Sequence, residues 1–344
     1  MHLDLRGHPL HSRALSLTLA QRADGRLDAR GSLLDLRKRG FVPVGGELQP
    51  SGIVHHMLLD AIVDPETARL ERIVAAQPSV AFEPSPASRG ESCRDLAWRV
   101  EALAGAVLDD GFAKRAGVEI GGPRGCSHVL TLAHFLGAAT AWALGQDRAM
   151  HGAAARPAGQ RIFRRDLIVD GAESAPGKVA IAVQMTDLAF TPVAGDVQRA
   201  MDAFAAELEV RVRADVDLAR FAFTAIEAGQ RRRTLADVGN ATWEDRSAAV
   251  MGLVGLGLHR GISAALFSRL GRPDDRPLLD ALLMVPPALI QVIAALSERW
   301  PALAKENGWF IGTAGFPDSC YMWRKDGALL RSRVPNDPPL GAPG

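Results

Sequence analysis

The segment Gly121-Gly-Pro-Arg-Gly-Cys-Ser-His128 combines residue types that can do chemistry with a backbone that can present them. A glycine- and proline-rich loop brings Cys126 and His128 to the expected start of a helix. Free N–H groups and the positive end of the helix dipole stabilise a negative charge there. We therefore expect a lowered pKa for Cys126, which beside an imidazole could act as a nucleophile or an acid–base group. The structural alternative is that Ser127 caps the helix, Cys126 is a small buried side chain and His128 is half exposed.

Four further residues complete the predicted site. His55-His56 opens an expected strand, in which alternate side chains point to opposite faces, so that His56 and Asp60 share one face and can reach a common cleft. For His55 we favour a polar position on an edge strand. Cys93 lies just before an expected helix, where an unpaired buried thiol is the structural alternative. Cys320 belongs to a C-terminal extension that can close over the site.

These six residues predict an acid–base enzyme that needs no organic cofactor. Cys126 and His128 would move protons, and the other four residues would face or assist them in a dry pocket. We expect a lyase or isomerase of the hydratase/dehydratase type, acting on a small, largely apolar alcohol or alkene. The sequence patterns of serine hydrolases, kinases, P-loop proteins and dinucleotide-binding proteins are all absent.

Two other classes of function stay open. A metalloprotein could use Cys93, Cys126, His128 and either His55 or His56 as ligands, although no C-x2-C or H-x3-H pair supplies a local chelate. A non-catalytic protein could enclose an apolar ligand or serve in assembly. Such a protein would have no reason to lower the pKa of Cys126, so the reactivity of that thiol separates it from an enzyme.

The chain also predicts an internal duplication. Gly25 precedes Asp35 by the same ten positions that separate Gly177 from Asp187. Six further residues have an identical residue 150 positions later, in unbroken order: Asp95, Val100, Leu103, Gly105, Gly111 and Leu132. Repetition in constant order predicts two packed copies of one module and a pseudo-twofold axis.

The two copies differ where the chemistry is expected. Arg276 and Leu278 stand in the second copy where Cys126 and His128 stand in the first. A residue that the shared fold needs should survive in both copies, whereas a site needs only one. We therefore expect a polar cleft in the first copy only, and a filled or solvent-facing equivalent around Leu278.

Periodicity predicts strands followed by helices in each copy. The strands are expected at 14–20, 26–34, 56–63 and 69–76, and near 165–170, 178–186, 207–214 and 218–226. The helices are expected at 95–108 and 127–144, and near 244–259 and 278–298. Each copy is then a four-strand antiparallel plus two-helix module, and the fold class is α+β with the helices on one face of the sheet.

The predicted domains follow the copies. Residues 1–150 carry the site, 160–300 form a degenerate second repeat, 301–334 are an extension that packs back on the core, and 335–344 are a disordered tail.

Composition limits the partners. The 344 residues are 47% hydrophobic with a net charge of +1, so neither nucleic acid nor an anionic membrane is expected as a partner. The charged N-terminus does not resemble a signal peptide, and three widely spaced cysteines fit a reducing cytoplasm. The apolar segment 278–296 contains Asp280, Gln291 and a proline pair, which favours a broken buried helix over a membrane span. The expected partner is a small apolar molecule; the oligomeric state is open, with a homo-oligomer as one possibility.

Several of these residues together resemble a known family. The chain resembles a bacterial family catalogued only as a domain of unknown function, in which a hairpin with a late Asp, a V-H-x-M strand, a P-x-x-x-C element and a G-C-T-H-L helix start recur. The corresponding residues are Asp35, Val54-His-His-Met57, Cys93 and Gly125-Cys-Ser-His-Val129. Ser127 and Val129 depart from the last motif, and the second histidine leaves His55 and His56 as alternatives. The resemblance covers mainly residues 14–145 and implies no particular reaction.

Overall fold

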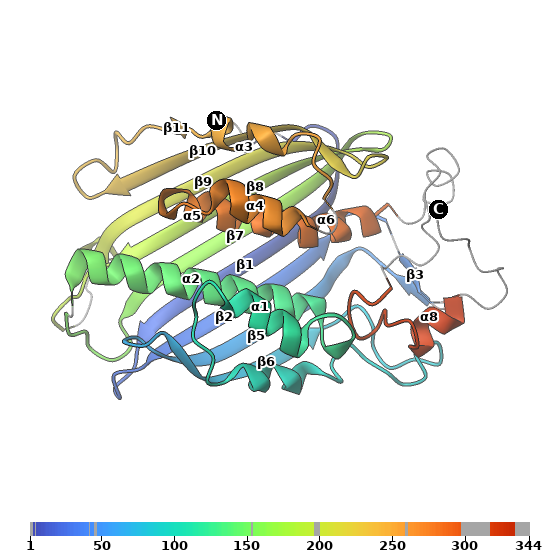
Figure 1. The fold of residues 1–344 in the computed structure, drawn as a ribbon, viewed down its shortest axis with the longest axis horizontal. Helices are drawn as coiled ribbons and strands as arrows, with labels where there is room; N and C mark the ends of the chain where they lie inside the picture. The colour runs from blue at the N-terminus through green and yellow to red at the C-terminus, as the bar shows by residue number, and fades with distance from the viewer. Residues whose placement is uncertain are drawn as a thin grey trace.

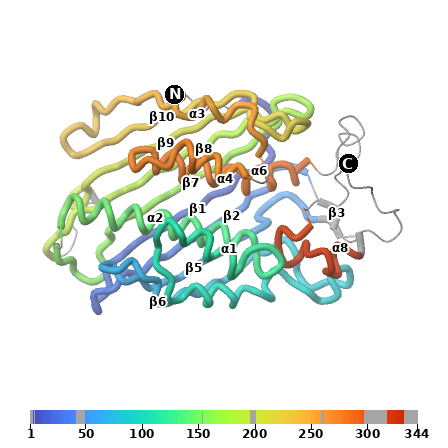
Figure 2. The backbone as a smooth tube through the Cα atoms, viewed as in Figure 1, coloured from blue at the N-terminus to red at the C-terminus, as the bar shows by residue number. Residues whose placement is uncertain are grey.

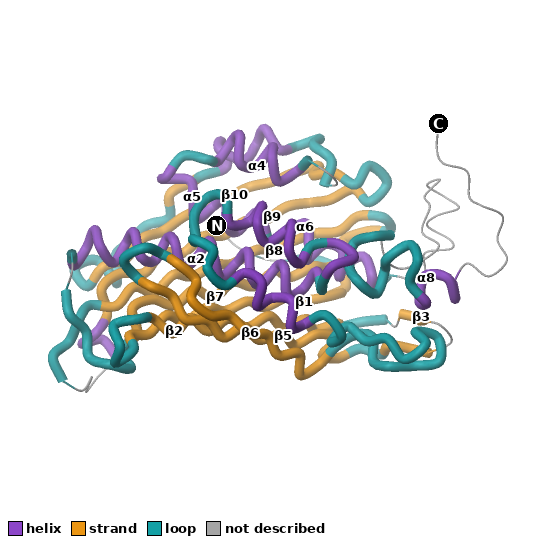
Figure 3. Tube along the Cα trace, turned by 60° about the horizontal axis from the view of Figure 1, so that its bottom comes forward, coloured by secondary structure: helices purple, strands orange, loops and turns teal. Residues whose placement is uncertain are grey.

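A computed structural model of the chain describes residues 3, 5–40, 42–44, 47–152, 154–195, 200–258, 261–296 and 317–333. In this part of the chain, nine strands form one antiparallel sheet, and the helices lie over one face of it (Figures 1 and 3). The α+β class, with an antiparallel sheet covered by helices on one face, is therefore confirmed.

Eight of the nine strands are long. In chain order the strands of the sheet are β1 (His8–Gln21), β2 (Leu27–Arg37), β5 (Gly52–Asp64), β6 (Arg69–Ser79), β7 (Arg161–Ala175), β8 (Lys178–Phe190), β9 (Phe204–Asp217), β10 (Ala222–Thr234) and the short β11 (Glu244–Asp245). Their order across the sheet is β11-β10-β9-β8-β7-β1-β2-β5-β6. A separate small hairpin consists of β3 (Val42–Val44) and β4 (Glu47–Gln49).

The two halves of the chain meet in the middle of the sheet. β1 pairs with β2 on one side and with β7 on the other, and both pairings are antiparallel. The first half supplies the strands on one side of this junction and the second half supplies those on the other (Figure 2). The two halves therefore share one continuous sheet.

Alternation along the strands decides which side chains face the helices. In β1, Leu15, Leu17 and Leu19 are buried, whereas Ser16 and Thr18 between them point to the opposite face. This two-residue period is typical of an antiparallel sheet with one face packed on a core. In β1 and β2 the odd-numbered residues thus face the helices. Some of these buried residues are charged.

The helices come mainly after the strands of each half. They are α1 (Phe112–Ile120), α2 (Ser127–His151), α3 (Ser247–Val250), α4 (Ile262–Leu270), α5 (Arg276–Leu283), α6 (Val285–Ala294) and α8 (Ala328–Arg333). Short 3-10 turns accompany them at η1 (Ala97–Leu103), η2 (Gly122–Arg124), η3 (Ala200–Ala203), η4 (Met251–Leu253) and η5 (Pro273–Asp275). α2 and α6 both pack on the central strands β1 and β7 (Figure 2).

The close approach of α1 to α2 requires a glycine. A Cβ added to Gly137 on α2 would lie 2.4 Å from the ring of Phe112 on α1, far inside van der Waals contact. The helix that presents the predicted Cys–His segment is therefore held between the sheet on one side and α1 on the other.

Most predicted elements are confirmed, and the strands are longer than expected. The helix expected from residue 127 does begin at Ser127, and it continues to His151. The predicted broken helix at 278–298 consists of α5 and α6, which meet at Met284 just before the proline pair. The strand expected near 218–226 begins later, at Ala222, because residue 221 still belongs to the turn, with a φ of 47°.

Two helix predictions are wrong in type. Residues 95–108 contain the 3-10 turn η1 and no α-helix, and Gly111 is the N-cap of α1, not the residue past a helix end. In the second predicted helix, 244–259, the described residues 244–258 likewise contain only the two-residue strand β11, the single turn α3 and η4. In both segments a glycine with positive φ, Gly105 at 86° and Gly255 at 82°, stops helix propagation, although the apolar spacing alone favours a helix.

Part of the C-terminal extension packs back on the first half. Trp323 is buried with its ring edge-on to Phe82, and the N–H of Tyr321 donates to the backbone oxygen of Gly125 at 2.9 Å. Residues 301–316 and the predicted tail 335–344 lie outside the described residues.

Two helical stretches in the described part of the chain are long and apolar enough to span a membrane. They are Ser127–His151 and Pro273–Ala294, and 61% and 72% of their most apolar windows are buried inside the protein. Buried core helices pass the same length and composition test, so these stretches are weak evidence for a membrane.

Leu278 tests the packing of the second half. Its side chain is 1% exposed on α5, so we expect Leu278→Ala to lower the free energy of unfolding by about 2–4 kcal/mol. Leu235→Ala is the matched control, because Leu235 is 58% exposed and should cost less than about 0.5 kcal/mol. Urea unfolding followed by circular dichroism measures both. Equal losses in the two variants would contradict the packing of α5 described above.

Candidate functional site

A row of charged and polar side chains crosses three neighbouring strands on the face covered by helices. Arg13 on β1 pairs directly with Asp35 on β2, and Asp35 pairs directly with His55 on β5. In the adjacent row, His11 on β1 pairs with Arg37 on β2. All five side chains are buried. The pairing register therefore brings residues from three separate segments into one cluster.

Asp35 is the centre of this cluster. Arg13 donates from Nε to Oδ1 and from Nη2 to Oδ2, each at 2.8 Å. The ring of His11 lies 2.9 Å from Oδ1 through Nε2, and the ring of His55 lies 3.1 Å from Oδ2 through Nδ1. A guanidinium fork on a carboxylate is among the strongest polar contacts in proteins, and here it is fully removed from water.

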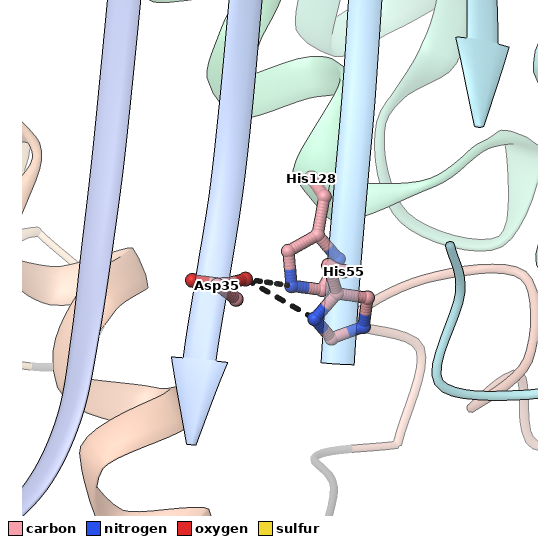
Figure 4. A group of neighbouring side chains, drawn as sticks. All are labelled: Asp35, His55 and His128. Carbon is pink, nitrogen blue, oxygen red and sulfur yellow. Dashed lines mark hydrogen bonds and ion pairs between the residues drawn. The ribbon is translucent and has the colours of Figure 1, made fainter. Parts of the chain in front are cut away.

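His128 reaches the cluster from the first turn of α2. Its Nε2 lies 3.3 Å from Oδ2 of Asp35, and its ring stacks on that of His55 with centroids 3.6 Å apart and an interplanar angle of 27° (Figure 4). The side-chain nitrogen of Gln291, on α6, is 3.2 Å from Nε2 of His128. The side chain of His128 is 12% exposed, whereas those of Asp35 and His55 are at most 4% exposed. The cluster therefore comes nearest to solvent at His128.

Burial and the Arg13 charge determine the protonation of the cluster. Burial alone would raise the pKa of Asp35, but the Arg13 charge and the hydrogen bonds from Arg13, His11 and His55 hold it well below its usual range. Burial lowers the pKa of His11 and His55, and it lowers the pKa of His128 strongly. At neutral pH the cluster thus contains an ionised carboxylate surrounded by neutral imidazoles.

The structure brings Cys126 and His128 together but corrects the predicted state of the thiol. Sγ of Cys126 lies 3.8 Å from Nδ1 of His128, and Cys126 is the N-cap of α2. Burial nevertheless raises the pKa of Cys126, outweighing the backbone N–H groups of residues 128 and 129 that act in the opposite direction. Cys126 is therefore a protonated thiol at neutral pH and not the activated nucleophile that its helix position predicts. Ser127 is the first residue of the helix and not its cap.

The other two thiols lie near Cys126. Burial raises the pKa of Cys93 strongly, and the neighbouring thiols of Cys126 and Cys320 raise it further. Burial raises the pKa of Cys320 to about 11, with Cys126 as the next cause. The segment before η1 and the C-terminal segment thus converge on the start of α2, so these two predicted residues do lie beside the site.

The prediction that His56 and Asp60 face the cluster is wrong. Both lie on the opposite face of β5 from His55, and the side chain of Asp60 is 65% exposed beside Arg30. The alternation argument was correct, but it was applied to the wrong histidine, because the face of the strand that is buried could not be read from His55-His56 alone. His55 is the histidine of the site.

Sequence reasoning missed His11, Arg13, Arg37 and Gln291. The first three share a recognisable signal, because each is a polar residue on the otherwise apolar face of a strand. On β1, for example, His11 and Arg13 lie on the same face as Leu15 and the alternate leucines after it. Gln291 carried a weaker signal, as an amide inside an apolar helix. No local spacing links these segments, which only strand pairing brings together.

The expected polar cleft in the first half alone is also not what the structure shows. A cavity of about 170 Å³ lies between the two halves. Residues of α1 and α2 line it from the first half, and Arg165, Arg276 and Asp280 are among the lining residues from the second half. Leu278 itself is buried, as expected for a filled position.

One group among the described residues has the geometry to hold a metal ion. The ligand atoms of Asp35, His55 and His128 all lie within 4.8 Å of one another. This set differs from the predicted one, which combined Cys93 and Cys126 with histidines. The two histidine nitrogens contact Oδ2 of Asp35, and both carboxylate oxygens accept from Arg13. A cation would therefore have to displace hydrogen bonds beside a guanidinium.

The first half of the chain matches a known family model. Residues 11–141 match the model of the family described as Protein of unknown function (DUF2889). This match to DUF2889 confirms the resemblance to a family of unknown function. It includes His11, Arg13, Asp35, His55 and His128, and it ends before β7. No curated protein and no solved structure matches the chain.

The buried neutral histidines predict a loss of stability as the pH falls below 7. Burial lowers the pKa of His11, His55 and His128 in the folded chain, so the unfolded chain binds more protons below its histidine pKa of about 6.5. Each histidine that stays neutral should therefore cost about 1 kcal/mol of unfolding free energy by pH 5.5. Urea unfolding at pH 7.5 and 5.5 measures this loss. His128→Gln should reduce it by about 1 kcal/mol, whereas His56→Gln, on the opposite face of β5, should not change it. An unchanged loss in His128→Gln would show that His128 is not held neutral.

Proposed function

We propose that this protein is an enzyme that needs no organic cofactor and catalyses a proton transfer of the lyase or isomerase type, with His128 as its acid–base group. The observation that carries the proposal is the position of His128. It is a neutral imidazole at the solvent-nearest point of a buried cluster, 3.3 Å from a carboxylate that Arg13 keeps ionised. A neutral imidazole can accept a proton, and the adjacent carboxylate stabilises the imidazolium that results.

The acceptor sites of Asp35 explain why His128 is the available base. A carboxylate offers about four lone-pair positions, and Arg13 occupies two, with His11 and His55 at the others. His128 is left with the longer contact of 3.3 Å from Nε2 to Oδ2 of Asp35, and the amide nitrogen of Gln291 lies 3.2 Å from the same Nε2. A substrate that displaces this amide would meet the imidazole nitrogen directly.

A dehydration illustrates the chemistry that this arrangement supports. His128 takes a proton from carbon, the electrons of that C–H bond form the double bond, and the C–O bond on the neighbouring carbon breaks. The departing hydroxyl needs a proton to leave as water. Cys126 is protonated at neutral pH and lies beside His128, so it is the nearest candidate donor. Hydration is the same sequence in reverse.

We infer an internal duplication from the following correspondences, and it would place the chemistry in the first half. Arg165 donates from Nε and Nη2 to the two oxygens of Asp187, just as Arg13 does to Asp35, and both residues of the pair lie 152 positions further along the chain. The turns after β6 and β10 also correspond. The N–H of Gly105 donates to Leu70 and that of Gly255 donates to Phe223, and both glycines have a φ near 85°. Gly111 and Gly261 do not correspond in this way, with φ of −82° and 96°.

The histidines are the part of the cluster that the second half lacks. The residue 152 positions after His11 is Phe163, and Leu278 corresponds to His128 at the offset of 150 that applies in that region. The cross-strand partner of Asp187 is Leu208, where that of Asp35 is His55. The ion pair is thus common to both halves, and the imidazoles are confined to one. We infer that the pair belongs to the fold of the module and that the histidines belong to its chemistry.

Deuterium exchange tests the proposed reaction without knowledge of the natural substrate. An enzyme that removes a proton next to an activating group replaces it with deuterium in D2O, which NMR detects across a panel of small alcohols, hydroxy acids and their alkenes. We expect exchange in at least one compound, and a loss of about 100-fold or more in His128→Gln. His56→Gln is the control and should retain the wild-type rate. Exchange that is insensitive to His128→Gln would refute the assignment.

A metalloprotein is the second candidate, favoured by the grouping of Asp35, His55 and His128. Two imidazoles and one carboxylate would suit a divalent transition metal, which would supply Lewis-acid or redox chemistry when bound. The Arg13 fork on Asp35 makes this arrangement less suitable for a cation than for a neutral substrate.

Elemental analysis of protein purified without a metal-affinity tag distinguishes the two candidates. If His128 is an acid–base group, the wild-type protein should contain less than about 0.1 equivalent of any transition metal and still catalyse exchange. A stoichiometric metal that is lost in both His55→Gln and His128→Gln, but retained in His56→Gln, would replace the acid–base proposal by the metal site.

A further inference from the structure

Arg37 is a buried guanidinium without a carboxylate partner. In the described part of the chain Arg13, Arg37 and Arg165 are buried, and the side chain of Arg156 is 1% exposed and pairs with Asp147. Arg13 and Arg165 each hold an aspartate in a two-point fork. Within the same described residues, Arg37 has no carboxylate oxygen within 4 Å. A buried charge is costly unless it is paired, so the unpaired guanidinium needs an explanation.

The remaining contacts of Arg37 leave one edge of its guanidinium free. Nη1 donates to the backbone oxygen of Gln49 at 3.2 Å, and Nε is buried without a hydrogen-bond partner. Asp35, two residues earlier on the same face of β2, cannot serve Arg37 because its acceptor positions are occupied. Burial lowers the pKa of Arg37 to about 10, in spite of the opposing attraction of Asp35. The guanidinium stays charged at neutral pH, and no carboxylate of the described residues pairs with it.

His11 presents a second unused group beside Arg37. The two residues are direct cross-strand partners, so their side chains stand next to each other on the buried face. His11 contacts Asp35 through Nε2, and its Nδ1 is buried with no partner. Since a neutral imidazole that donates from Nε2 has a lone pair on Nδ1, His11 offers an acceptor where Arg37 offers donors.

We propose that this site binds a small hydroxycarboxylate, whose carboxylate pairs with Arg37 and whose hydroxyl donates to Nδ1 of His11. The proposal names the substrate class of the proposed proton transfer and in that respect rests on it. It replaces the expected largely apolar alcohol by an alcohol that also carries one negative charge.

The charge of the cluster favours a monoanion. Arg13 and Asp35 cancel each other, the three imidazoles are neutral, and Arg37 contributes a single uncompensated positive charge. The free edge of a guanidinium has the two-point geometry that a carboxylate fits. A phosphate dianion would bring more negative charge than the site can neutralise.

Binding of matched probes tests this inference independently of turnover. Lactate and 3-hydroxypropionate supply both groups, propionate lacks the hydroxyl, lactamide lacks the charge, and inorganic phosphate tests the anion class. Dissociation constants come from NMR titrations of the histidine ring signals of the wild-type protein. We expect at least one of the two hydroxy acids to bind about tenfold more tightly than propionate, lactamide and phosphate. Equal binding of acid and amide, or no binding of either hydroxy acid, would overturn the proposal.

Variants of two arginines on β2 test which side chain binds the carboxylate of the hydroxy acid. Arg37→Gln should weaken binding of the hydroxy acid at least about tenfold, and Arg37→Lys should restore part of it. Arg30→Gln is the matched control, because Arg30 lies on the opposite face of the same strand with its side chain 73% exposed. Wild-type affinity in Arg37→Gln would refute the role of Arg37. If Arg37→Gln does not fold, the comparison of acid with amide on the wild-type protein still decides.

Failure of this inference can be distinguished from failure of the proposed function. His128→Gln should lose deuterium exchange but keep the hydroxy acid bound. Exchange with no preference for a charged substrate would refute the hydroxycarboxylate and leave His128 as the base. Tight binding of hydroxy acids without exchange would refute His128 as the base and leave the hydroxycarboxylate site in place.

Discussion

Arg13 and Asp35 face each other across two central strands, in a part of the sheet that excludes water, and the other polar groups of the site are arranged around this pair. Either charge alone would be strongly destabilising there, since breaking a buried ion pair typically costs about 3–5 kcal/mol. Together they form a two-point contact that keeps the carboxylate ionised. The ionised carboxylate then orients His11 and His55 by accepting hydrogen bonds from them, and the stacked ring of His55 positions His128.

The second half contains a similar buried ion pair with different neighbours. Arg165 holds Asp187 in the same fork, and its remaining edge donates to Asp280, whose other oxygen accepts from Arg276 at 2.8 Å. The donors and acceptors of this network therefore satisfy one another. In the first half, Nε of Arg37 and Nδ1 of His11 have no hydrogen-bond partner among the residues that the structure describes. The same ion pair is thus closed on itself in one half and left with unused polar groups in the other.

The sequence predicted the elements better than it predicted the site, for a physical reason. Alternation and turn residues are local signals, and they correctly located the eight long strands and the start of α2 at Ser127. The site depends on which strands pair and in which register, and these are non-local properties. Arg13, Asp35 and His55 become neighbours only when β1, β2 and β5 align. Periodicity alone also failed at residues 95–108, where the residues with helical spacing form a 3-10 turn that ends at Leu103, just before a glycine with positive φ.

Polar residues inside an apolar alternation were the signal that local reasoning could have used. On β1, His11 and Arg13 lie on the same buried face as the alternate leucines that follow them. On β2, Asp35 and Arg37 lie on the same buried face as Leu33 before them. A charged residue on a buried face must be paired within the fold or with a ligand. Searching for such positions, before searching for cysteines and histidines in loops, would have identified most of the cluster.

The environment of His128 also links substrate charge to reactivity. Burial raises the pKa of Cys126 although the thiol lies at a helix N-terminus, and burial lowers the pKa of His128 although a carboxylate lies 3.3 Å away. Desolvation therefore outweighs both the helix dipole and the nearby charge at this position. The imidazole is consequently a weak base in the free protein. A carboxylate bound at Arg37 would add negative charge near the three imidazoles, and negative charge favours the imidazolium form. Binding of an anion would thus raise the basicity of His128 at the moment when a substrate is in place, whereas a neutral molecule of the same shape would leave the base weak.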